Sequence, residues 1–199
     1  VRIDDVRDGK NLKQYVLPIE AERSSNTVAT LLWDNLEYVL ALPKSNNESL
    51  QAKANEKNAS FVERGKVIAQ AFPEFKEFAA VVKFYDNNGI EKAQSAENWE
   101  IILNERASTI TINVTFQLQH SLKTIGEHPL VAKYVNSLMR TDGDQICLVT
   151  GEKCTPVQLT HRTPIKGSNT KAKLVAFQED KGYDSYGKEQ CLHSPISTM

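Results

Sequence analysis

Three short segments near the carboxyl end of the chain combine residue types that could contact nucleic acid. They read Cys-Leu-Val-Thr-Gly-Glu at 147–152, Pro-Ile-Lys-Gly at 164–167, and Ser-Tyr-Gly-Lys-Glu-Gln at 185–190. Lysine can bind a phosphate, Gln, Asn and Ser can hydrogen-bond base edges, and glycine lets another backbone approach closely. The segments therefore predict loops that bind nucleic acid rather than a catalytic centre.

Each predicted contact has a definite role. Lysines of the first turn are expected to position phosphates, polar side chains to reach a groove, and glycines to shape the two turns. The predicted DNA-binding residues are Lys166, Gly167, Asn169, Lys171, Lys173, Gly187, Lys188 and Gln190. The alternative is that both segments are ordinary solvated turns, in which Gly, Asn and Lys are common.

The distribution of charge along the chain favours nucleic-acid contact at one local segment and not over the whole protein. The chain carries 24 Lys and Arg against 25 Asp and Glu, so no overall field would draw it onto DNA. Between Gly151 and Val175, however, five cations face a single carboxylate, Glu152. That excess is enough for several phosphate contacts and a salt-dependent affinity.

The cysteines and histidines raise two alternatives, a structural zinc site and a metal-dependent nuclease. Soft ligands occur at Cys147, Cys154, His161, Cys191 and His193. Six residues separate the first two, whereas paired zinc ligands usually have two to four between them, so no metal or other cofactor is predicted. The hairpin leading to His161 resembles that of His-Asn-His endonucleases only faintly, because it lacks a His or Asp pair.

Other catalytic patterns are missing from the sequence. It contains no phosphate-binding Gly-x-x-x-x-Gly-Lys-Ser/Thr loop and no Gly-x-Ser-x-Gly nucleophile elbow. The four histidines are scattered and have no evident nucleophile beside them. We therefore expect a protein that is not an enzyme.

The elements that must position these turns follow from periodicity. Helices are predicted from about 28 to 42, from 46 or 47 to 71, over 75–85 and over 128–140, with a strand over 109–117. Further strands are predicted at 146–149, 157–159 and 172–177. This order, α-rich first and β-rich last, predicts an α+β fold with a mixed or antiparallel sheet packed against helices. The predicted division is a helical and mixed part over 1–140 and a hairpin-rich, DNA-facing part over 141–199.

Composition sets broad limits. An apolar content of 40% over 199 residues can bury a real core, but no stretch reaches the length of a membrane span and no signal peptide opens the chain. A soluble cytoplasmic protein is expected. Because the sequence starts at Val1 without a Met, we expect a fragment of a longer protein.

Three stretches together resemble one known family. They are Leu-Trp-Asp-Asn at 32–35 with Tyr-Val-Leu at 38–40, then 147–152 with His161 and Ile-Lys-Gly at 165–167, and finally 185–190 with Ser-Pro at 194–195. Their order and separation resemble the N-terminal region of the large subunit of the type I-C (Dvulg subtype) CRISPR Cascade complex. The sequence departs from that pattern at Cys191 and His193, where the family would have a small residue such as Gly and an Asn.

The resemblance implies a DNA-recognition and assembly subunit in antiviral defence. Such a protein would inspect the short motif flanking the target on double-stranded DNA, and the guide RNA would then read the sequence by base pairing. The partners implied are the guide RNA ribonucleoprotein subunits of Cascade, the target duplex and the helicase-nuclease effector, which would do the cutting. An anti-CRISPR protein is a further partner that could occupy the DNA site.

Overall fold

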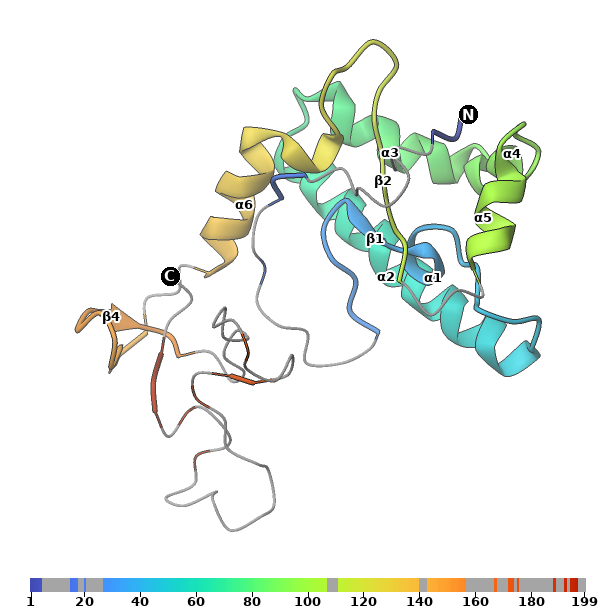
Figure 1. Cartoon of the computed structure of the whole chain (residues 1–199). Helices are drawn as coiled ribbons and strands as arrows, with labels where there is room; N and C mark the ends of the chain where they lie inside the picture. Colours follow the sequence, from blue (N-terminus) through green and yellow to red (C-terminus); the bar gives the residue numbers. More distant parts are fainter. Residues whose placement is uncertain are drawn as a thin grey trace. The chain divides into compact units, whose positions relative to one another are not determined.

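The computed structural model describes residues 1–4, 15–17, 20, 27–106, 111–139, 143–156, 167, 172–173, 175, 188, 192 and 194–196 (Figure 1). Contacts divide the chain into two compact units, one of Val1–Pro18 with Ser25–Ala132 and one of Ile19–Ser24 with Lys133–Met199. Within the described ranges, no helix is long and apolar enough to cross a membrane. The division predicted after residue 140 stays a prediction.

The first unit starts with a strand that leads directly into a helix. β1 (Trp33–Asn35) runs into α1 (Leu36–Val39), and Asn35 caps that helix by accepting a hydrogen bond from the Glu37 N–H at 3.0 Å. β1 pairs antiparallel with β2 (Asn113–Thr115). The predicted helix over 28–42 is therefore wrong outside its four residues 36–39.

Two long helices follow, and both confirm predictions. α2 (Glu48–Ala71) is capped by Asn47, whose side chain accepts from the backbone N–H groups of Ser49 and Leu50. α3 (Lys76–Asp86) packs against α2 after the break at Pro73. α6 (Pro129–Met139) matches the predicted helix over 128–140, and a short 3-10 helix, η1 (Ile125–Glu127), precedes it.

Two further helices were not predicted. α4 (Gly89–Gln94) and α5 (Trp99–Glu105) occupy a stretch that is acidic and mixed in sequence. Trp99 and Ile102 of α5 and Ile90 of α4 pack against the core of the first unit. Tertiary packing therefore stabilises helices that are too short to form alone.

An aromatic cluster lies in the core of the first unit. Phe61 of α2, Phe84 and Tyr85 of α3, and Phe116 beyond β2 contact one another with ring centroids 5.0 to 6.3 Å apart. The Tyr85 hydroxyl donates to the Val39 carbonyl at 2.9 Å, and burial raises the pKa of Tyr85 far above its usual range. This cluster joins α1, α2, α3 and the end of β2 into one rigid core.

The second unit contains a small hairpin. β3 (Gln145–Ile146) pairs antiparallel with β4 (Lys153–Cys154), with Gln145 opposite Cys154. The described partner of β3 is β4, whereas the strand predicted at 157–159 lies outside the described residues and stays a prediction. Helices and two small antiparallel sheets together confirm the α+β class.

Candidate nucleic-acid interface

The turn at 147–152, the first of the predicted segments, is closed by backbone hydrogen bonds. The Cys147 N–H donates to the Glu152 carbonyl at 2.8 Å, and the Gly151 N–H donates to the Cys147 carbonyl at 2.9 Å. Gly151 has a positive φ of 72°, which a residue without a side chain adopts without strain. The segment is therefore the tip of the β3–β4 hairpin, with a defined shape.

The hairpin is anchored to a segment near the carboxyl end. The Leu148 N–H donates to the Pro195 carbonyl at 2.8 Å, and Cys147, Cys154 and Ile196 form a buried cluster with Val175 packed against it. Burial, with further contributions from the Cys147 thiol beside it, raises the pKa of the Cys154 thiol. Both cysteines are thiols that behave as small apolar side chains in this cluster.

The exposed surface of the hairpin is largely apolar. Ile146, Leu148 and Val149 are 60%, 67% and 51% exposed, whereas Lys153 is the exposed cation of β4. The turn itself therefore offers apolar contact area, and phosphate contacts would have to come from the later lysines.

Three of the predicted DNA-binding residues, Gly167, Lys173 and Lys188, lie among the residues that the structure describes. Gly167 is exposed with a φ of 86°, and a Cβ built there would meet nothing within 4 Å. Lys188 is exposed. Lys173 is half-buried, and its backbone forms a single β-bridge. The positive φ confirms the turn predicted at Gly167. Lys166, Asn169, Lys171, Gly187 and Gln190 lie outside the described residues, so the convergence of the two turns stays a prediction.

The metal alternative is tested only where side chains are described. There, no group of three His, Cys, Asp or Glu side chains is placed to hold a metal ion. Of the five soft ligands in the sequence, Cys147 and Cys154 are described and lie together in the buried cluster. His161, Cys191 and His193 lie outside the described residues.

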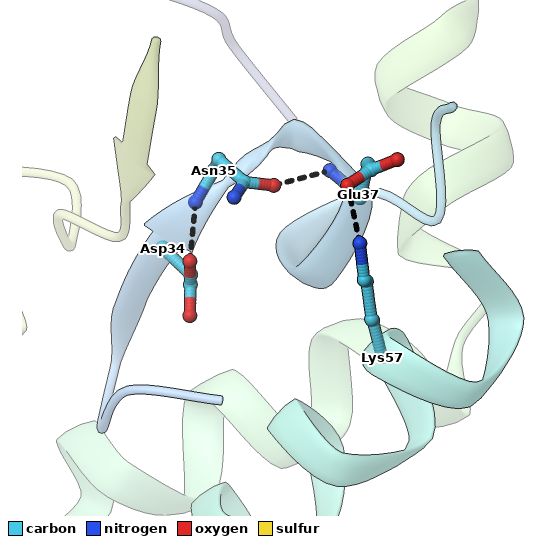
Figure 2. A network of polar contacts seen from close by, with 4 residues as sticks. All are labelled: Asp34, Asn35, Glu37 and Lys57. Atoms are coloured by element: carbon cyan, nitrogen blue, oxygen red, sulfur yellow. Dashed lines mark hydrogen bonds and ion pairs between the residues drawn. The ribbon is translucent and has the colours of Figure 1, made fainter. Parts of the chain in front are cut away.

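A polar network at the β1–α1 corner joins Asp34, Asn35, Glu37 and Lys57 (Figure 2). The Asp34 carboxylate is buried and accepts hydrogen bonds from the backbone N–H groups of Thr30 at 2.9 Å and Asn35 at 2.8 Å. Glu37 pairs with Lys57 of α2 at 2.6 Å, with both side chains largely buried. These groups have partners within the fold, so the network stabilises the β1–α1 corner.

A protruding loop was missed by the sequence reasoning. Residues 117–123 follow β2 as the yellow segment of Figure 1 and carry the most exposed large apolar side chain described, Leu122, at 97%. Its polar side chains, Gln117, Gln119, His120 and Lys123, are exposed as well. The sequence offers only a weak signal, because the polar run after the strand contains two leucines, Leu118 and Leu122, and does not tell which of them is exposed.

The base of this loop is firmly held. The Ile125 N–H donates to the Phe116 carbonyl at 2.8 Å, and Ile125 is buried. Thr124 and Glu127 form a capping box, in which the Glu127 carboxylate accepts from the Thr124 N–H at 2.9 Å and hydroxyl at 3.0 Å. Burial acts to raise the pKa of Glu127, but the hydrogen bonds from Thr124 and Val16 and the charge of Lys123 lower it overall.

Comparison with known proteins identifies the family. The family described as CRISPR-associated protein (Cas_Csd1) matches residues 1–199 of the chain. A search of curated proteins finds no match. The match supports the Cascade-type assignment made from the sequence, and the I-C subtype and the large-subunit role stay predictions. The chain belongs to the Cas_Csd1 family of CRISPR-associated proteins.

Proposed function

We propose that this chain is the N-terminal part of the large subunit of a type I-C Cascade and recognises the motif that flanks the target on double-stranded DNA. It binds DNA in a complex with the guide RNA ribonucleoprotein subunits and helps to recruit the helicase-nuclease effector. Protein contacts to the flanking motif come first, and base pairing to the guide then reads the target sequence. The chain itself binds and does not cut.

Family membership is the observation that carries this proposal. The turn at Gly167 supports it, because the open space around that exposed residue allows a ligand backbone to approach closely. Lys188 supports it too, since an exposed ammonium group can bind a phosphate or a guanine edge. The local excess of cations from 151 to 175 provides the sequence-independent part of the affinity.

Two buried groups among the described residues are poorly suited to cleavage chemistry. The Cys154 thiol is buried and its raised pKa keeps it protonated at neutral pH, so it is a poor nucleophile. The Asp34 carboxylate accepts hydrogen bonds from neighbouring backbone and is shielded from solvent. Neither group is free to act as a nucleophile or a general base.

The test is reconstitution of the complex with guide RNA and partner subunits, followed by target binding across a library of flanking motifs at fixed salt. Replacing Lys188 and Gln190 together by Ala should weaken binding to the preferred motif by about 1 to 3 kcal/mol per lost base contact. Lys44→Ala removes an exposed lysine elsewhere and is the charge-matched control. Equal affinity of the double variant and the control for every motif would refute the groove assignment.

A salt series separates phosphate contacts from base contacts. Lys171→Ala should reduce the affinity for all motifs alike and flatten the plot of log affinity against log salt by about one unit. A slope identical to the parent's would remove Lys171 from the contact set. The nuclease alternative is tested on the same preparations by plasmid nicking with added divalent metal, where nicking that depends on His161 would contradict a purely binding role.

A further inference from the structure

We propose that Cys147, Cys154, Cys191 and His193 bind one zinc ion, which holds the β3–β4 hairpin to the segment near the carboxyl end. The site goes beyond the proposed function, and its metal can be measured without DNA, so either proposal can fail while the other stands. Spacing in the sequence argues against zinc, because six residues separate the first two cysteines. The hairpin removes that objection, since it brings the two cysteines together.

The two cysteines of the hairpin share one face of it. Gln145 of β3 is paired with Cys154 of β4, and the Cys147 N–H continues the ladder by donating to the Glu152 carbonyl at 2.8 Å. Side chains alternate between the two faces of a hairpin, so Gln145, Cys147 and Cys154 lie on the same face. The two thiols are in hydrogen-bonding contact, and the two cysteines are 1% and 8% exposed. The hairpin therefore presents two sulfur ligands to one buried point.

The segment that carries the other two ligands is bonded to this hairpin. The Leu148 N–H donates to the Pro195 carbonyl at 2.8 Å, and Ile196 is buried against both hairpin cysteines. Cys191 and His193 lie outside the described residues, but they precede Pro195 by only four and two residues. A chain that spans at most about 3.6 Å per residue keeps His193 within roughly 7 Å of Pro195, and Cys191 within roughly 14 Å. Covalent connection thus allows a third thiol and an imidazole to reach the pair.

A buried oxygen without a partner supports the histidine as a ligand. The Gln145 side-chain oxygen is buried and accepts no hydrogen bond from the described residues, and it belongs to the face that holds the two thiols. A histidine that binds zinc through one ring nitrogen donates its other N–H to a nearby acceptor, which fixes the orientation of the ring. Gln145 is that acceptor, and it is therefore a positioning residue for His193.

The chemistry of the four ligands selects zinc and a structural role. Three cysteines and one histidine form one of the tetrahedral sets found in structural zinc sites, whereas Mg²⁺ and Ca²⁺ take oxygen ligands. All four positions are filled by the protein, so none is left for a catalytic water. Burial raises the pKa of the Cys154 thiol in the metal-free chain, and zinc takes the place of that proton when it binds.

The ion has a consequence for the predicted DNA contacts, and this consequence alone rests on the proposed function. Cys191 directly follows the segment 185–190, which contains Lys188 and Gln190, and Cys147 begins the turn 147–152. A metal ion bound to both cysteines joins the two segments at one point. The second turn is thereby held in a defined position before DNA arrives.

The experiment uses the purified protein, analysed for metals and then stripped with a chelator under reducing conditions. Co²⁺ added to the stripped protein should give the visible bands of a tetrahedral site and sulfur-to-cobalt absorption that indicates three thiolates. Cys191→Ser and His193→Asn should each lower the zinc affinity by at least about a hundredfold, because loss of an outer-shell partner alone costs about 10- to 100-fold. Gln145→Leu should lower the affinity by about tenfold and keep the tetrahedral cobalt spectrum.

Two histidine variants are the controls. His120→Asn makes the same change at an exposed residue of the first unit, whose φ of 71° asparagine tolerates, and it should leave the zinc affinity unchanged. His161→Asn changes the other histidine near the hairpin in sequence and should also leave it unchanged. Zinc lost in His161→Asn and retained in His193→Asn would overturn the ligand set.

The parent protein alone can overturn the site, even where a variant fails to fold. A parent without zinc that gives no tetrahedral cobalt spectrum would do so, and so would iron or copper as the bound metal. A disulfide between Cys147 and Cys154 in zinc-free protein would also do so, because it consumes two ligands. None of these results bears on motif recognition, which is measured separately in the reconstituted complex.

Discussion

The buried carboxylate of Asp34 allows a stability prediction with a magnitude worked from its contacts. The side chain is 2% exposed and accepts hydrogen bonds from the Thr30 N–H, the Thr30 hydroxyl and the Asn35 N–H at 2.9, 3.1 and 2.8 Å. Asp34→Ala removes the acceptor and leaves two backbone N–H groups without it. Since each of the two buried donors costs about 1 to 3 kcal/mol when it lacks an acceptor, the free energy of unfolding should fall by about 2 to 6 kcal/mol.

A second substitution separates hydrogen bonding from packing. Asp34→Asn keeps the shape and one acceptor oxygen, so it should cost about 1 to 2 kcal/mol, clearly less than Asp34→Ala. The assay is urea unfolding at pH 7, followed by tryptophan fluorescence, which can sense the adjacent Trp33. Glu56→Ala, at an exposed position of α2, is the control and should change stability by less than about 0.5 kcal/mol.

The reasoning would be refuted by a loss of less than about 1 kcal/mol in Asp34→Ala with an unchanged denaturant slope. That result would mean that water or a rearranged backbone supplies acceptors as good as the carboxylate. An Asp34→Asn variant as unstable as Asp34→Ala would instead show that the charge of the group, and not its number of acceptors, holds the corner.

Three further predictions concern the backbone and pH. Ala41 has a φ of 50°, so Ala41→Gly should raise the free energy of unfolding by about 0.5 to 1 kcal/mol in urea titrations, and a loss would contradict the strain argument. The folded-state pKa of Glu127 lies below its ordinary 4.5, so its stabilising contribution is complete above that pH and is lost as the pH falls through the folded pKa. The melting temperature of the parent should therefore fall more steeply below pH 4.5 than that of Glu127→Gln, and parallel curves would count against the capping box. A Cβ on Gly143 would lie 2.2 Å from the Cys154 carbonyl oxygen, so Gly143→Ala should displace the hairpin and raise the rate at which a thiol reagent labels Cys147 and Cys154. Labelling rates equal to the parent's would show that the hairpin can shift freely.

The longest helices could be predicted from the sequence because their signals are local. Asn47 provides a side-chain cap for α2 and Pro73 ends it, while apolar residues recur at helical spacing through α3. α6 starts at Pro129, where a missing N–H costs nothing. Each of these helices is marked in the sequence by at least one local signal, which is a side-chain cap, helical spacing or a proline at a boundary.

The first predicted helix failed because side chains compete with helical hydrogen bonds. Its apolar spacing over 28–42 suits a helix, but the Asp34 carboxylate bonds the Thr30 N–H and thus fixes a non-helical turn. Leu32 inside that turn has a φ of 65°, a conformation that no α-helix contains. Periodicity does not report such side-chain bonds, so the strand β1 could not be predicted.

The DNA contacts of the candidate interface stay predictions, whereas one turn within it can be compared with the structure. Lysine and glycine in a local cation excess indicated the turn at Gly167, and its positive φ agrees with that interpretation. Loop 117–123 was not recognised, because its prominence depends on how far Leu122 stands out from the fold. Exposure of a single apolar side chain is a property of the tertiary structure, and spacing in the sequence does not encode it.

The bond between Leu148 and Pro195 has a consequence for synthesis of the chain on the ribosome. The hairpin emerges first, but its anchor Pro195 and then Ile196, which packs against the two thiols, are translated 47 and 48 residues after Leu148. At about 5 to 20 residues per second, that delay lasts roughly 2 to 10 seconds. During that interval Cys147 and Cys154 lack their final cover, so nascent chains should be far more sensitive to oxidants than the finished protein.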